Sequence, residues 1–351
     1  MIKINFPALT GIRAIAAFMV YIHHFGLPYI DYFNVNIKNF FSEFHVGVTI
    51  FFVLSGFLIC NRYYGEIDLN FKEFFVKRFA RVYPIYFILS TITFIISLFS
   101  VSKMSIQVYI LNISFLRGFF DDYKFSGIAQ GWSLTVEEMF YLFSPVFFIL
   151  IKRKKLFLVV IPIVFILFGY LLVFLLSDLN FYGLMKNSEF MFDFTFFGRI
   201  FEFICGMFLS IYFNKIKKIN KIKFNTYFGF VIIIIGIYSL SLLKVGNGAG
   251  TDSLFGKLIN NLLLPLFGII PFFYGLITET TFFSKILSSK IFQILGKSSY
   301  VFYLIHMGFL SEILNNISTN YFFVLIMLTL FSIILYNFVE KPLNNLIRSK
   351  L

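Results

Sequence analysis

Apolar stretches of about 20 residues recur along the chain from one end to the other. Each is long enough to cross a bilayer as an α-helix, because the hydrocarbon core is roughly 30 Å thick. The 351 residues are 59% hydrophobic and 13% charged, whereas soluble domains carry roughly 25% charged residues. The sequence therefore predicts an all-α, polytopic membrane protein with about ten transmembrane helices.

The apolar segments follow one another without a polar linker. Residues 1–351 are therefore predicted to form a single transmembrane domain with no appended soluble domain. The first segment has no clear cleavage site and is predicted to be a retained helix rather than a signal peptide. An amphipathic stretch at 104–120 is predicted to be re-entrant or interfacial. The predicted spans are 9–29, 44–62, 79–100, 132–151, 155–176, 197–213, 227–243, 258–277, 293–311 and 321–338.

Basic residues are distributed unevenly between the loops. With the N-terminus in the cytoplasm, 20 of the 30 Lys and Arg residues fall in or beside inside loops and 7 in outside loops. This bias follows the positive-inside rule and predicts an even number of spans with both termini cytoplasmic. The net charge of +13 then lies beside helices, where anionic lipid headgroups rather than nucleic acid are the natural partner. Cys60 and Cys205 lie inside apolar runs and predict neither a disulfide framework nor a metal site.

The first predicted helix carries ionisable side chains, which are costly in a membrane and often mark function. Arg13 and His24 are 11 residues apart, so in a helix they share one face and differ in height by about 16 Å. His23 points about 80° away from Arg13. The structural alternative is a snorkelling arginine and a histidine that only joins two helices.

The third predicted helix opens with Arg78 and Arg81, which lie on the same side at the cytoplasmic surface. Two guanidinium groups this close form a good clamp for an anion, because each can bind a phosphate group through two hydrogen bonds. The alternative is a pair of basic anchors that follows the positive-inside rule.

Two further helices carry ionisable residues in the outer half of the membrane. Glu137 and Glu138 follow Trp132, which suits an interface belt, and consecutive acids in an apolar span are hard to explain by packing. Glu137 is predicted at nearly the same level as His24. His306 is predicted in the outer half of the ninth span, although a buried histidine often only bonds a neighbouring helix.

Taken together, these segments resemble the acyltransferase 3 family of bacterial inner-membrane acyltransferases. The matching stretches cover nearly the whole chain, appear in the family's order, and are specific as a set rather than singly. They are LTGIRA (9–14) with His24, GVTIFFVLSGFLI (47–59), KRFARVYP (77–84), WSLTVEEMFY (132–141), RIFEFICGM (199–207), SYVFYLIH (299–306) and VEKP (339–342). Thr49 stands where typical members have an acidic or polar residue, and no role is assigned to it.

The resemblance implies a multi-pass enzyme of the bacterial cytoplasmic membrane with no permanently bound cofactor. Such enzymes transfer an acyl group, usually acetyl, from cytoplasmic acyl-CoA to a hydroxyl of an exported envelope polysaccharide or glycolipid. On this basis Arg13, Arg78 and Arg81 are predicted to bind the phosphates of acetyl-CoA. His24 is predicted to be the general base, because a neutral imidazole can accept a proton near pH 7. Glu137 is predicted to support it, and His306 to be a second participant.

Two other classes of protein would also use some of these residues. A transporter or flippase for an anionic lipid-linked sugar would need intramembrane Arg, His and Glu, but neither an inverted repeat nor a pair of broken helices is visible. A non-catalytic scaffold of polysaccharide assembly would not require Arg13 and His24 to line up. Consumption of acetyl-CoA in purified membranes discriminates the enzyme from both.

Overall fold

The predicted apolar segments form helices in the computed structural model, which describes residues 6–27, 34–66, 69–100, 103–179, 181–216, 224–246 and 248–350. Within these ranges the regular structure is helical, apart from one isolated β-bridge between Phe120 and Leu184. Nine described helices are long and apolar enough to cross a membrane. The all-α, polytopic membrane architecture is thus confirmed. Lys3 and the basic segment 217–223, which contribute to the orientation argument, lie outside the described residues.

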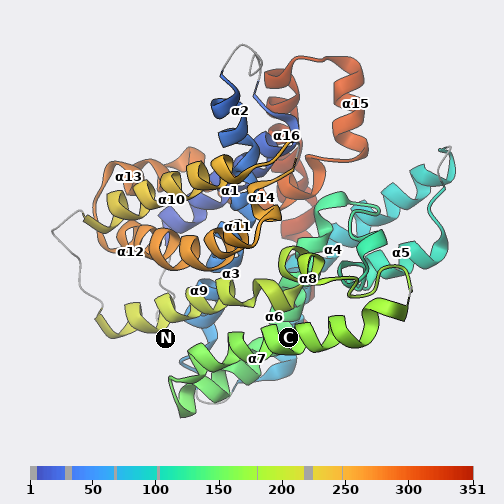
Figure 1. Ribbon diagram of the computed structural model, residues 1–351. Coiled ribbons are helices and arrows are strands. Elements are labelled where there is room, and N and C mark those ends of the chain that lie inside the picture. The colour runs from blue at the N-terminus through green and yellow to red at the C-terminus, as the bar shows by residue number, and fades with distance from the viewer. Residues whose placement is uncertain are drawn as a thin grey trace. The chain divides into compact units, whose positions relative to one another are not determined.

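The helices group into two compact units. The chain passes between them after residue 66, within α9 (Phe196–Ile216) and within α14 (Lys290–Ile305). Unit 1 contains residues 1–66 and 200–299, and unit 2 contains residues 67–199 and 300–351. The remaining elements of unit 1, labelled in part in Figure 1, are α1 (Pro7–Phe25), α2 (Val35–Ser42), η2 (Glu43–His45), α3 (Val46–Tyr63), α10 (Phe224–Leu243), η7 (Gly250–Asp252), α11 (Leu254–Leu258), η8 (Ile259–Ile269), α12 (Ile270–Thr278) and α13 (Phe282–Leu287).

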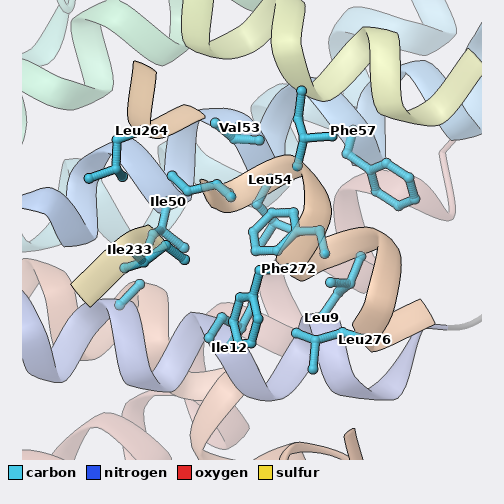
Figure 2. Close-up of a cluster of buried hydrophobic side chains, with 14 of the residues drawn as sticks. Leu9, Ile12, Ile50, Val53, Leu54, Phe57, Ile233, Leu264, Phe272 and Leu276 are labelled. Atoms are coloured by element: carbon cyan, nitrogen blue, oxygen red, sulfur yellow. The ribbon is translucent and has the colours of Figure 1, made fainter. Parts of the chain in front are cut away.

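Apolar side chains from several helices fill the core of unit 1. Figure 2 shows α1, α3, α10, η8 and α12 contributing to one cluster, which includes Leu9 of α1, Leu54 and Phe57 of α3, and Phe272 of α12. The helix α1 packs along α3, and α10 packs against α12 and the π-helical segment η8. This packing fixes α1, which carries Arg13 and His24.

Two glycines of the sequence motifs allow helices to approach closely in unit 1. A Cβ on Gly11 would fall on the backbone carbonyl of Leu287 in α13, and a Cβ on Gly56 would fall on the carbonyl of Phe203 in α9. Small residues serve this purpose at helix contacts in membranes, where tight packing replaces the hydrophobic effect. These motif glycines therefore have a packing role.

Unit 2 holds the remaining helices and a run of short turns between two of them. Its elements are α4 (Phe71–Leu98), α5 (Ile106–Ile113), η3 (Arg117–Phe119), η4 (Asp121–Tyr123), η5 (Ala129–Gly131), α6 (Trp132–Arg153), α7 (Phe157–Leu176), η6 (Ser177–Leu179), α8 (Ser188–Phe194), α15 (Phe309–Ile317), α16 (Tyr321–Leu335), η9 (Tyr336–Glu340) and α17 (Lys341–Arg348). At eight residues, α5 is too short to span a bilayer, in agreement with the prediction for 104–120.

The ninth predicted span is shorter than expected. The helix α14 has 16 residues and ends at Ile305, not at residue 311. Gly308 has a φ of 96°, a left-handed conformation that glycine adopts at little cost, and α15 starts directly after it. His306 therefore follows the end of a helix instead of lying within one, which corrects the sequence prediction.

A buried carboxylate caps the start of α10 in unit 1. Glu279 accepts hydrogen bonds from the backbone nitrogens of Asn225 and Thr226, at 2.9 and 3.0 Å, and from both of their side chains. The first nitrogens of a helix have no partner within the helix, so this carboxylate satisfies them. Burial alone would raise the pKa of Glu279, but these hydrogen bonds hold it below its usual value.

We expect Glu279→Ala to lower the free energy of unfolding of the purified protein by about 1.5–3 kcal/mol, which is the contribution of hydrogen bonds to a charged group. The loss is measured as a lower melting temperature. Because the folded-state pKa is lowered, this stabilisation is fully present above the unfolded pKa and is lost as the pH falls through the folded pKa. The difference in melting temperature between wild type and variant should therefore shrink in acid. Glu312→Ala, at an exposed position, is the control. An equal melting temperature for Glu279→Ala and wild type at neutral pH would contradict the capping role.

Candidate functional site

The first helix keeps Arg13 and His24 on one continuous element. The helix α1 runs without interruption from Pro7 to Phe25, so the shared face predicted from their spacing holds. Arg13 is half-buried, whereas His24 is exposed. Both residues belong to unit 1. An exposed imidazole at the end of a helix can meet a ligand from outside the unit.

Three of the four histidines lie close together in unit 1. The ring centroid of His23 is 4.7 Å from that of His24 and 5.4 Å from that of His45. His23 also bonds the backbone carbonyl of Ser42 through Nδ1. Nothing in the sequence indicated contact between these rings.

A buried acid accompanies these histidines. Glu43 is 0% exposed and forms an ion-pair contact of 2.9 Å between its Oε2 and Nε2 of His45. Its second oxygen accepts a hydrogen bond from the backbone nitrogen of Gly250, also at 2.9 Å. Sequence reasoning missed Glu43. The only signal was its position two residues before His45.

In unit 2, Arg78 lies beside the acidic helix α6. Its guanidinium carbon is 5.8 Å from the ring centroid of Tyr141, and the Tyr141 hydroxyl donates a hydrogen bond to Glu137. Arg78 is 5% exposed, and Arg81, one turn along α4, is half-buried. The sequence placed Arg78 at the cytoplasmic surface and Glu137 in the outer half of the membrane. In the structure Tyr141 contacts both side chains.

Glu138 shares this environment, since both Glu137 and Arg78 act on it electrostatically. A carboxylate pair beside an arginine can orient a hydroxyl group or hold a positive charge. Because Arg78 is buried against the Tyr141 ring, it also packs α4 against α6.

His306 is fully buried at the end of α14. Its Nδ1 lies 2.8 Å from the Tyr303 carbonyl and donates to it, so in the neutral ring Nε2 carries the lone pair. The side-chain amide of Gln130 donates to the same carbonyl at 2.6 Å and to that of Leu304 at 3.0 Å. Gln130 thus helps to hold the chain segment that orients His306.

Arg117 organises the segment that leads into α6. It is 0% exposed, and its guanidinium donates to the Asn112 side chain at 2.5 Å and to the carbonyls of Ser126 and Ile128. A Cβ on Gly131 would collide with this guanidinium. The sequence assigned no role to Arg117. Its partners are backbone and amide oxygens, which no sequence pattern identifies.

A family model described as an acyltransferase domain, Acyl_transf_3, matches residues 6–338. The chain belongs to the acyltransferase 3 family. The match covers all the predicted site residues, and it confirms the resemblance found from the motifs. No solved structure matches the chain.

Curated relatives of the chain carry acetyltransferase names. A protein of Staphylococcus aureus (strain COL), named provisionally as an O-acetyltransferase, is 27% identical over 96% of this chain and 57% of its own length. The peptidoglycan O-acetyltransferase OatA of Listeria monocytogenes is 29% identical over 44% of this chain and 26% of its own length. The chain thus spans little more than half the length of the first of these relatives.

Proposed function

We propose that this acyltransferase 3 chain moves an acetyl group from cytoplasmic acetyl-CoA to a hydroxyl of an exported envelope polysaccharide or glycolipid. The observation that carries the proposal is the family match over residues 6–338, together with relatives named for O-acetyl transfer. The continuous helix that bears Arg13 and the exposed His24 supports it.

In the proposed reaction, the acceptor hydroxyl oxygen attacks the thioester carbonyl carbon. His24 accepts the hydroxyl proton as the new C–O bond forms, and the C–S bond then breaks. The departing sulfur takes up a proton, which returns His24 to its neutral form and releases CoA. The products are an O-acetyl ester and the free thiol.

Other residues have proposed roles in this reaction. Arg13, Arg78 and Arg81 would bind the phosphates of the donor, because guanidinium groups bind phosphate through paired hydrogen bonds. The roles of Glu137, as the carboxylate that supports His24, and of His306, as a second participant, remain predictions. Arg78 is buried against the Tyr141 ring, whereas Arg81 is only half-buried, so Arg81 is the arginine of the pair better suited to an anion.

The proposal places both termini in the cytoplasm of a bacterial cell, with residues 177–196 outside and 152–155 inside. We expect Asp178→Cys to react with a membrane-impermeant thiol reagent in intact cells and Lys154→Cys to react only after permeabilisation. Both positions are exposed, while Cys60 and Cys205 are buried. The reverse labelling pattern would overturn the orientation and the assignment of the donor side.

The proposed function is tested in the native cell by deleting the gene and analysing surface glycans by mass spectrometry. We expect the deletion strain to lose O-acetyl groups from one class of envelope glycan, and the wild-type gene to restore them. Unchanged acetylation of every surface glycan in the deletion strain would contradict the proposal.

A further inference from the structure

The buried acid of unit 1 is held from two sides. Glu43 binds Nε2 of His45 with one oxygen and the backbone nitrogen of Gly250 with the other, both at 2.9 Å. Burying a carboxylate is costly unless it is paired and hydrogen-bonded. Both oxygens of Glu43 are engaged, so its position and charge are well defined.

The histidine rings connect this carboxylate with the exposed surface. The rings of His45 and His23 meet at 82° and those of His23 and His24 at 62°. The exposed fraction rises along this row, from 0% for Glu43 to 19% for the His45 side chain and to the exposed His24. The row therefore runs from a buried negative charge to the imidazole that a substrate can reach.

We propose that Glu43 and His45 are positioning residues that hold His24 and stabilise the positive charge it acquires. This inference rests on the proposed function, in which His24 accepts the acceptor's proton. A carboxylate beside an imidazole has this role in hydrolytic triads, where it orients the ring and stabilises the imidazolium. The sequence assigned such support to Glu137. In unit 1, the Glu43 carboxylate contacts the row of histidines through His45.

Other charged groups of unit 1 lie on the elements that carry or contact these residues. Lys244, which follows α10, donates to the Ser42 hydroxyl at 2.9 Å and acts on His23 and Glu43 electrostatically. Lys38 on α2 is exposed, and Asp252 lies on η7, the element that binds Glu43 through Gly250. Arg62 lies at the far end of α3. Replacing Glu43 leaves these other charged groups in place. A difference in kcat between wild type and Glu43→Gln therefore reports the effect of the Glu43 charge.

The test measures transfer of labelled acetyl from acetyl-CoA to the native glycans of membrane vesicles, at clamped pH on both sides. We expect Glu43→Gln and His45→Ala to lower kcat roughly 10-fold or more, as for loss of part of an acid–base apparatus, with KM for acetyl-CoA unchanged. In Glu43→Gln the acid limb of the plot of kcat against pH should also move to lower pH. The reason is that protonated His24 is no longer stabilised by the negative charge of Glu43. Glu312→Gln, at an exposed position, is the control.

Wild-type kcat and an unmoved acid limb in both variants would overturn the inference. A lower kcat with an unmoved limb and a lower melting temperature would also overturn it, because this result indicates only a structural role. His45→Ala leaves the hydrogen bond between Glu43 and Gly250 in place. This variant therefore tests the link between Glu43 and His24 without removing the contact that Glu43 makes with η7. If wild-type vesicles transfer no label, the proposed function fails instead.

Discussion

His24→Ala is expected to abolish detectable acetyl transfer while expression and acetyl-CoA binding remain near wild type. A positioned general base contributes about 10²–10⁴-fold to a rate, and alanine cannot accept a proton. His24 is exposed, so its removal leaves no cavity in the core of unit 1. The measurement is the acetyl content of the surface polysaccharide in cells that carry each variant at matched protein level.

His23→Ala is the matched comparison on the same helix. Its ring lies between those of His24 and His45 and bonds the Ser42 carbonyl, so we expect a milder loss, through misplacement of His24. Glu137→Gln should resemble His24→Ala more than His23→Ala if Glu137 supports the base. Normal acetylation with His24→Ala would remove His24 from the chemistry and leave His306 as the residue to test.

Arg81→Ala is expected to weaken acetyl-CoA binding about 10- to 100-fold, because a hydrogen bond to a charged group contributes about 1.5–3 kcal/mol. Lysine should restore binding only in part, since an ammonium group cannot make the paired contacts of a guanidinium. Binding is measured by calorimetry on the purified protein.

Arg78→Ala should weaken binding and also lower the melting temperature more than Arg81→Ala does. The reason is that Arg78 is buried against the Tyr141 ring, so its removal leaves a gap between α4 and α6. Unchanged acetyl-CoA affinity in the Arg78→Ala, Arg81→Ala double variant would show that these arginines are membrane anchors.

The helices were predictable because the bilayer imposes both length and apolar character on each span. The segment 155–176, for example, corresponds to α7 (Phe157–Leu176), whose exposed side chains such as Phe174 are suited to lipid. The end of α14 was not predicted, because the apolar run continues past it. Gly308, with its positive φ, was the local signal for the break.

The candidate site was predictable only in its residue types. The spacing of Arg13 and His24 fixes their shared face because both lie on one helix. The contact between Arg78 and Tyr141 joins α4 to α6, and that between Glu43 and Gly250 joins residues 207 positions apart. Such pairs depend on how helices pack, which the period of a single helix does not contain.

Acetyl transfer from acetyl-CoA is measured as thiol release by purified protein in proteoliposomes supplied with envelope glycans. We expect free CoA to appear in equal amount to new O-acetyl esters, and both to depend on His24. Movement of glycan across the membrane without consumption of acetyl-CoA would contradict this expectation and would indicate a transporter.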